Sequence, residues 1–227
     1  MVPNDSPNPT AVIASGGGRY SDPHHAFAVT SARIAETLTD DGWTVTVFGD
    51  PAAALVALGG ADLLVMNAGP GEGGGEIDPD AASGLASALA RGIGVLSVHS
   101  SLLTLRDVPF WRETIGGAWV DASSWHPDIS DADIRIVDRD HPITAGADDF
   151  TLYDERYTDL VIDDPGIRVL AAHELDGVRH PLLWVREAGD SRVAVSALGH
   201  HERSYESREH RMLLARAARW AARLPGR

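Results

Sequence analysis

The sequence of 227 residues contains no cysteine and no lysine, and each absence excludes a class of chemistry. Without cysteine the protein has no disulfide, no thiolate nucleophile and no sulfur ligand for zinc, so any metal would need histidine or carboxylate ligands. Without lysine, Schiff-base catalysis and the lysine of a phosphate-binding P-loop are excluded as well. All 19 basic residues are therefore arginine.

Positive charge is scarce, because the formal net charge is -14 with histidine counted as neutral. Contact with nucleic acid or anionic membrane relies on basic patches, so we expect neither as a partner. No apolar run approaches membrane-spanning length. Residues 1–10 are rich in proline, asparagine, aspartate and serine and lack the regions of a signal peptide. We expect a disordered tail over residues 1–10, a single domain over residues 11–227, and a cytoplasmic location.

Apolar segments alternate with amphipathic ones in the first half of the sequence. Apolar or alternating runs predict strands, and spacings of three and four predict helices. A strand that precedes a helix, repeated three or four times, predicts a doubly wound, mainly parallel α/β sheet with helices on both faces. The expected strands are residues 11–14, 44–48, 61–67 and 93–98, and the expected helices are residues 27–39, a short helix through Leu55 and Leu58, and one starting at residues 78–80.

The second half is less regular. Residues 133–137 alternate like a half-exposed strand, and residues 141–157 are turn-rich. Further strands are expected at residues 167–171, 181–186 and 192–198, with helices at residues 109–115 and 207–224.

His99 ends the most apolar strand, and other histidines also follow expected strands. Ligands of open α/β sheets bind at the carboxyl ends of the strands, so these imidazoles are expected to converge there. Histidine serves as acid, base or metal ligand near neutral pH. The converging set is His24, His25, His99, His200 and His201.

Three interpretations of these residues remain open. A serine hydrolase would use Ser100 or Ser101 beside His99, but the Gly-x-Ser-x-Gly motif is absent. A divalent metal such as zinc would be bound by a histidine-plus-carboxylate site drawing on His25, His99, His126 or His200, although no His-x-x-x-His spacing is present. Asp154 and Glu155 are expected to point to opposite faces, which disfavours a glycosidase pair, and the alternative to a site role for Glu155 is an arginine partner or a cap.

Seven segments together give the sequence a family resemblance. Their order resembles that of the trehalose-utilisation (ThuA-like) family, from residue 11 to residue 224. The resemblance implies a flavodoxin-like fold of the class I glutamine amidotransferase type with a nucleophile elbow. The elbow cysteine is matched by His99, so glutaminase activity is not expected, and Ser97 replaces the usual glycine. The segments are residues 16–18 with 24–27, 94–101, 116–119, 141–146, 153–157, 181–184 and 197–200.

The resemblance implies a role in bacterial use of trehalose or a related disaccharide or keto-sugar. We expect an enzyme acting on a small-molecule sugar, with His99 and His200 as catalytic acid/base groups or metal ligands. A metal-dependent hydrolase of another small polar substrate and a non-catalytic binding module are the alternatives, and a homodimer is the default assembly. The expected substrate-binding residues are His24, His25, Asn67, Ser100, His126, Glu155, Trp184 and His201, with Trp125 as a further aromatic wall.

Overall fold

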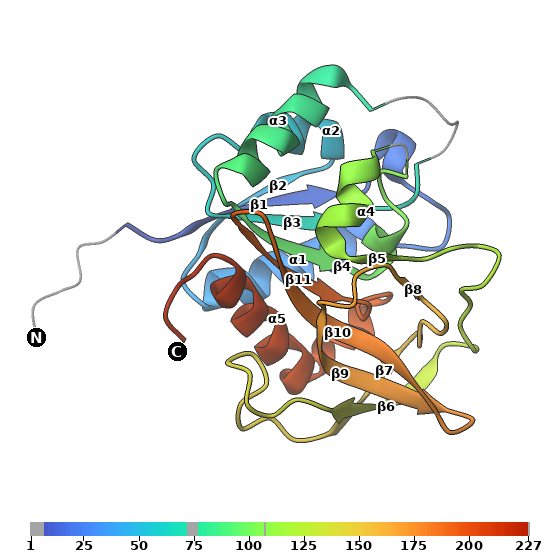
Figure 1. Cartoon of the computed structure of the whole chain (residues 1–227). Coiled ribbons are helices and arrows are strands. Elements are labelled where there is room, and N and C mark those ends of the chain that lie inside the picture. The colour runs from blue at the N-terminus through green and yellow to red at the C-terminus, as the bar shows by residue number, and fades with distance from the viewer. Residues whose placement is uncertain (1–6, 72–76, 107, 227) are drawn as a thin grey trace, which may run out of the picture.

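One large sheet organises the computed structural model, which describes residues 7–71, 77–106 and 108–226 (Figure 1). The sheet has nine strands in the order β2-β1-β3-β4-β11-β10-β9-β6-β7. Its first five strands are mutually parallel, so their carboxyl ends lie along one edge. These five strands are β2 (Thr44–Phe48), β1 (Thr10–Ser15), β3 (Leu63–Asn67), β4 (Gly94–Val98) and β11 (Ser191–Ser196).

The other four strands extend the sheet in antiparallel fashion, through hairpins and a returning loop. They are β10 (Val178–Ala188), β9 (Arg168–Leu175), β6 (Ser130–Ile136) and β7 (Phe150–Asp154). A separate two-stranded sheet pairs β5 (Gly117–Ala118) with β8 (Val161–Ile162). The architecture is thus mixed α/β, and across the sheet the five parallel strands are followed by the four antiparallel ones.

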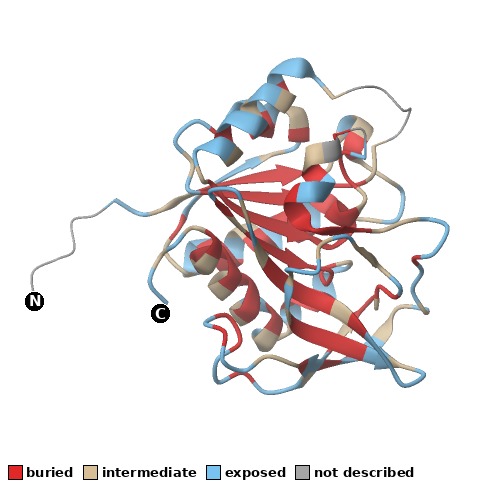
Figure 2. Ribbon diagram, viewed as in Figure 1, coloured by how far each residue is buried: buried red, intermediate tan, exposed pale blue. Residues whose placement is uncertain are grey.

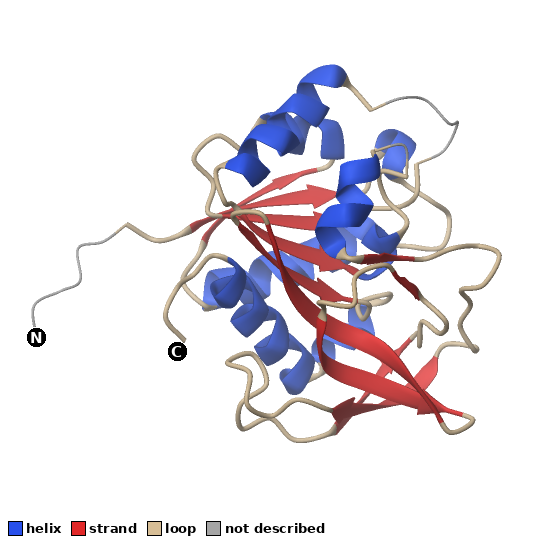
Figure 3. Ribbon diagram, in the orientation of Figure 1, coloured by secondary structure: helices blue, strands red, loops and turns tan. Residues whose placement is uncertain are grey.

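Helices cover both faces of the parallel strands (Figures 1 and 3), as expected from the sequence. One face carries α1 (Phe27–Asp40) and α5 (Arg208–Ala221), which contact each other. The other carries α2 (Pro51–Val56), α3 (Pro79–Ala90) and α4 (Pro109–Ile115). The side chains of Asp50 and Asp78 accept hydrogen bonds from the first backbone N–H groups of α2 and α3, which fixes where these helices begin. Three short 3-10 helices follow strands or loops: η1 (Gly18–Tyr20), η2 (His99–Leu102) and η3 (Glu202–Glu206).

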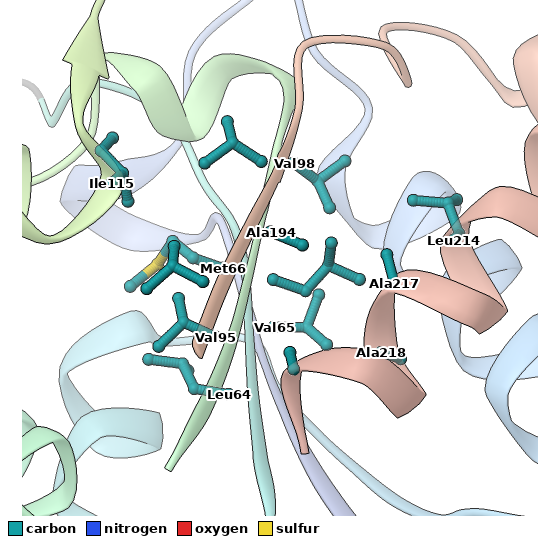
Figure 4. Packing of buried hydrophobic residues seen from close by; sticks show 14 of the residues in the cluster. Leu64, Val65, Met66, Val95, Val98, Ile115, Ala194, Leu214, Ala217 and Ala218 are labelled. Carbon is teal, nitrogen blue, oxygen red and sulfur yellow. The ribbon is translucent and has the colours of Figure 1, made fainter. Parts of the chain in front are cut away.

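The core lies on both sides of β3 and β4, every residue of which is buried (Figure 2). Successive side chains of a strand point to opposite faces. Accordingly, Val65 lies on the side of α5, where Ala217 packs, whereas Leu64 and Met66 lie on the opposite side (Figure 4). Burial on both faces explains why these segments read as continuous apolar runs.

The expected elements of the parallel half are present, with ends that differ by a few residues. The first strand starts at Thr10, one residue inside the expected tail, and residues 1–6 of that tail lie outside the described residues. The sequence interpretation was wrong about residues 150–154, which form β7 instead of a turn. It also did not foresee the short pair β5 and β8. Within the described residues, no helix is both long enough and apolar enough to cross a membrane.

Candidate functional site

The turn after β4 places His99 at the carboxyl edge of the sheet. Its φ of 46° lies in the left-handed region, which non-glycine residues adopt rarely and usually at functional turns. Ser100 and Ser101 hold the turn, because their hydroxyls donate to the carbonyls of Ala68 (3.1 Å) and Met66 (2.7 Å). Both serines are fully buried, so these hydroxyls serve the backbone of the neighbouring strand. The abrupt strand-to-helix turn expected from the sequence is therefore observed.

Hydrogen bonds fix the orientation and tautomer of the His99 ring. Its Nδ1 lies 2.8 Å from the carbonyl oxygen of Ala197, which can only accept, so Nδ1 carries the proton. Its Nε2 is then a lone-pair acceptor, and the hydroxyl of Tyr157 lies 2.9 Å from it. The imidazole is 1% exposed and thus lies beneath the site.

His25 approaches the same point from the loop that follows η1. Its Nδ1 lies 2.8 and 2.9 Å from the two carboxylate oxygens of Asp22, so Nδ1 is the donor. Asp22 also accepts the backbone N–H groups of His24 and His25, so one carboxylate holds both the backbone and the ring of His25. The Nε2 of His25 is buried and has no hydrogen-bond partner. The ring centroid lies 5.1 Å from that of His99 and 4.7 Å from that of His200.

Glu155 and His200 complete the cluster. The Glu155 Oε2 lies 3.2 Å from His200 Nδ1 and 3.4 Å from His99 Nε2, and these two nitrogens are 3.2 Å apart. The other carboxylate oxygen, Oε1, lies 3.6 Å from Nε2 of His126. We call His25, His99, Glu155 and His200 the four-residue cluster.

Asp154 joins the two segments that supply Glu155 and His200. Its carboxylate is fully buried and accepts the backbone N–H groups of Gly199 (2.7 Å), His200 (3.1 Å) and Glu155 (2.9 Å). Gly199 has a φ of 120°, a conformation that glycine adopts readily. The end of β7 and the loop after β11 are therefore locked together by one side chain.

The four-residue cluster combines charged and neutral side chains at neutral pH. Burial disfavours a charged Glu155, but the hydrogen bond with His200 and the closeness of His99 outweigh burial and hold the pKa of Glu155 well below its usual range. Burial also disfavours a charged His200, yet its hydrogen bond to Glu155 raises the pKa of His200. For His25, burial and the neighbouring His99 lower the pKa to about 4 against the opposing effect of Asp22, so its ring is neutral. Burial, with the nearby carboxylates, raises the pKa of Tyr157 well above its usual value, so the phenol stays protonated.

A cavity of about 620 Å³ opens above the cluster. Such a volume lies within the ~300–1,000 Å³ typical of small-molecule sites. Trp119 and Tyr157 form an aromatic wall, with ring centroids 4.6 Å apart, and His126 packs near both rings. The lining residues are Pro23, His24, His25, Leu103, Trp119, His126, Glu155, Tyr157 and His200.

The cavity thus brings together five of the expected site residues, with His99 directly below them. These five are His24, His25, His126, Glu155 and His200. Glu155 was expected to bind substrate hydroxyls, with an arginine partner or a cap as the alternative, and its ion-pair partners among the described residues are histidines.

Other expected residues lie outside the cavity. Asn67 is buried, and its amide donates to the hydroxyls of Thr30 and Ser31 in α1, both at 2.9 Å. Trp184 is fully buried on β10 and donates its indole N–H to the carbonyl of Ile115. Both side chains therefore have their polar groups satisfied within the fold, as does that of Ser100.

Two more of the expected residues, His201 and Trp125, do not line the cavity. His201 is exposed and accepts the N–H of Arg203 at the start of η3. Trp125 is 45% exposed and donates to Asp159. The aromatic wall expected from Trp125 and Trp184 is instead formed by Trp119 and Tyr157.

Sequence reasoning missed Asp22, Tyr157 and Trp119 as site residues. The spacing of Asp22 and His25 by three residues is a weak signal for such a pair in a turn. Tyr157 and Trp119 lie in segments that carried the family resemblance, but their pattern assigned them no role.

The donor atoms of the four-residue cluster lie within 4.8 Å of one another, which is compatible with a metal ion. Three imidazole nitrogens and one carboxylate oxygen form a donor set typical of zinc and related ions. Three of the four histidines named as candidate ligands belong to this set together with one carboxylate, that of Glu155, and His126 does not belong to it.

Comparisons with known proteins agree with this architecture. The family model described as ThuA, trehalose utilisation, matches residues 12–221. The structure is similar to a ThuA-like protein from Parabacteroides merdae, with a TM-score of 0.80, 17% identity, and coverage of 96% of this chain and 90% of that one.

Two further solved structures have similar folds. A ThuA-like protein from Bacteroides uniformis gives a TM-score of 0.73 at 13% identity, with 96% and 92% of the two chains covered. A GMP synthase component from Thermoplasma acidophilum gives 0.57 at 12% identity, with 94% and 96% covered. At these identities the similarity extends to the fold alone. None of the curated proteins matches the sequence.

Proposed function

Because this chain belongs to the trehalose-utilisation (ThuA) family, we propose that it is an enzyme that acts on a carbohydrate at the four-residue cluster. The observation that carries the proposal is the polarised histidine–carboxylate cluster at the base of a cavity with an aromatic wall. We further assign the fold to the flavodoxin-like class I glutamine amidotransferase type. The order β2-β1-β3-β4-β11 supports this assignment, since it follows the flavodoxin-like order 2-1-3-4-5.

The chemistry of the cavity favours an uncharged sugar. A sugar ring has one apolar face, which suits the rings of Trp119 and Tyr157, and hydroxyls that suit carboxylate and imidazole groups. No arginine occurs among the described residues that line the cavity. Glu155 and the net charge of -14 would repel a phosphate. A neutral mono- or disaccharide, or a keto-sugar, therefore fits better than a sugar phosphate.

The cluster offers hydrogen-bond acceptors and proton donors for reaction at a sugar oxygen or an adjacent carbon. Glu155 is ionised and, with its lowered pKa, accepts hydrogen bonds from sugar hydroxyls, while the raised pKa of His200 makes it the acid. Tyr157 stays protonated and donates a hydrogen bond. His99 lies below the cavity lining, so we assign it the role of positioning Glu155, His200 and Tyr157.

A sugar library tests the proposal. Thermal unfolding is recorded with neutral sugars, keto-sugars and glycosides, and each stabilising compound is then incubated with the protein and analysed for products by mass spectrometry. We expect turnover of at least one stabilising sugar, abolished in Glu155→Gln and retained in His201→Ala, which alters an exposed histidine outside the cavity. Stabilisation without turnover would instead identify a binding module, and no response to any sugar would refute the carbohydrate assignment.

A further inference from the structure

Lone pairs of the four-residue cluster converge on one point, and among them the Nε2 of His25 has no hydrogen-bond partner. The Nδ1 protons of His25 and His99 are committed to Asp22 and to the carbonyl of Ala197, so each Nε2 presents a lone pair to the centre. Glu155 Oε2 is also an acceptor. Nδ1 of His200 lies 3.2 Å from both Glu155 Oε2 and His99 Nε2, but it has a single proton at most to share between them.

We propose that these four residues bind a divalent first-row transition metal ion, with Zn²⁺ as the probe of choice. The ligand atoms would be Nε2 of His25, Nε2 of His99, Oε2 of Glu155 and Nδ1 of His200. Imidazole and carboxylate donors suit such ions, whereas Mg²⁺ and Ca²⁺ prefer all-oxygen sites. The site extends the proposed function, because a bound ion would polarise a sugar oxygen in the cavity.

The distances within the cluster match a tetrahedral site. Ligands about 2.0–2.1 Å from a tetrahedral Zn²⁺ lie roughly 3.3–3.4 Å from one another. The three mutual separations among His99 Nε2, His200 Nδ1 and Glu155 Oε2 are 3.2, 3.4 and 3.2 Å. The fourth donor, on His25, belongs to a group whose members all lie within 4.8 Å of one another. A modest movement of the loop at residues 22–25 would bring its nitrogen onto the ion.

The surroundings of the ligands are those of a metal site. Histidine ligands usually donate their second ring N–H to a carboxylate or a backbone carbonyl, which fixes the tautomer and orients the ring. Asp22 does so for His25, and Ala197 does so for His99. The Nε2 of His25 is buried without a hydrogen-bond partner, as expected for a group that is completed by an ion. On binding, the ion would replace the hydrogen bond that His99 Nε2 receives from Tyr157.

The experiment uses full-length protein without a histidine tag. Metal content is measured by mass spectrometry as purified, the protein is stripped with a chelator, and Zn²⁺ is titrated against a chromophoric competitor. We expect one ion per chain with a Kd tighter than about 1 μM. Co²⁺ titrated in place of Zn²⁺ should give the intense visible absorption of tetrahedral coordination.

Matched variants separate ligands from neighbours. His25→Ala and Glu155→Gln should each weaken Zn²⁺ binding by at least about tenfold, the lower end for disturbance of a metal site. His24→Ala alters an exposed cavity histidine outside the ligand set and should leave Kd unchanged. Far-UV circular dichroism and the melting temperature of each stripped variant check folding.

Failure to bind Zn²⁺ or Co²⁺ in the parent protein would overturn the inference, as would binding lost in His24→Ala but kept in His25→Ala. The titration contains no sugar, so it is independent of turnover. A protein without metal could still convert a sugar through Glu155 and His200. A metal-binding protein that ignores every sugar would refute the proposed function and leave the metal site intact.

Discussion

Asp154→Asn is the substitution that most directly tests how the site is assembled. The change keeps the shape of the side chain but replaces one carboxylate oxygen with an NH₂ group. Three backbone N–H groups, those of Glu155, Gly199 and His200, depend on the carboxylate of the parent protein. Whichever way the amide is oriented, at least one of these donors then faces another donor.

The expected loss of stability follows from those contacts. A hydrogen bond to a charged group contributes about 1.5–3 kcal/mol, and a buried donor left without an acceptor costs about 1–3 kcal/mol. The neutral amide is less costly to bury than the carboxylate, which offsets part of the loss. We therefore expect the free energy of unfolding to fall by about 2–4 kcal/mol, and Zn²⁺ affinity to fall about 10–100-fold because Glu155 and His200 lose their common anchor.

Urea unfolding followed by circular dichroism measures the first effect, and the competitor titration measures the second. Asp131→Asn serves as the control, because it makes the same chemical change at an exposed aspartate on β6. Surface changes of this kind usually stay within about 0.5 kcal/mol. A loss for Asp154→Asn no larger than that of the control would refute the idea that this carboxylate holds the two segments together.

Three other perturbations give separate tests. Gly199→Ala adds a Cβ that would lie 2.6 Å from the Tyr205 hydroxyl, at a residue with a φ of 120°. Urea unfolding should therefore show a loss of about 2–4 kcal/mol in the free energy of unfolding. The matched control Gly177→Ala should cost about 1–2 kcal/mol, because Gly177 also has a positive φ but an added Cβ there would meet no other atom within 4 Å. Asn67→Ala should cost about 2–3 kcal/mol in the same assay, yet leave KM for any sugar substrate unchanged, because its amide bonds lie within the core; a large rise in KM would contradict this placement. Burial lowers the pKa of His173 to about 4 from an ordinary value of 6.5, so stability from its neutral form is full above about pH 6.5 and is lost as pH falls toward 4. His173→Gln should therefore flatten the dependence of unfolding free energy on pH by up to about 1.4 kcal/mol per pH unit in that window, and an unchanged slope would refute the assignment.

The parallel half of the fold was accessible from sequence because its signals are local. The strands β3 and β4 are mostly apolar and buried throughout, since both of their faces are covered, and His99 follows the second run at its carboxyl end. The carboxyl ends of parallel strands meet at one edge of the sheet, so the approach of His25, His99 and His200 to one another could be predicted. Only the residue pattern and the general geometry of parallel sheets were needed.

The remaining site residues depend on contacts that no local pattern encodes. Asn67 and Met66 point to opposite faces of β3, and the sequence does not say that Asn67 faces Thr30 and Ser31 on α1. Likewise Trp184 belongs to the central part of β10, where residues 182–185 are all buried, so an aromatic residue there fills the core instead of a cavity wall.

The partners of Glu155 also could not be predicted from the local sequence. The alternation in residues 150–154 is short and lies at the edge of the sheet, so it was interpreted as a turn-rich region. Once β7 pairs with β6, the next residue is carried toward the end of β11 and meets the histidines. The partner of Glu155 is therefore decided by strand order, which a single sequence does not reveal.

The four-residue cluster draws on positions spread from residue 25 to residue 200. His99 and His200 alone are 101 positions apart along the chain, and Asp154 and Gly199 are separated by 45. Contacts between such distant positions require large loops to close, and proteins rich in them fold slowly. The cluster should therefore be among the last features to form during refolding, and a nascent chain whose β11 has not yet left the ribosome would lack it altogether. Recovery of zinc binding after dilution from urea would consequently report completion of the native state.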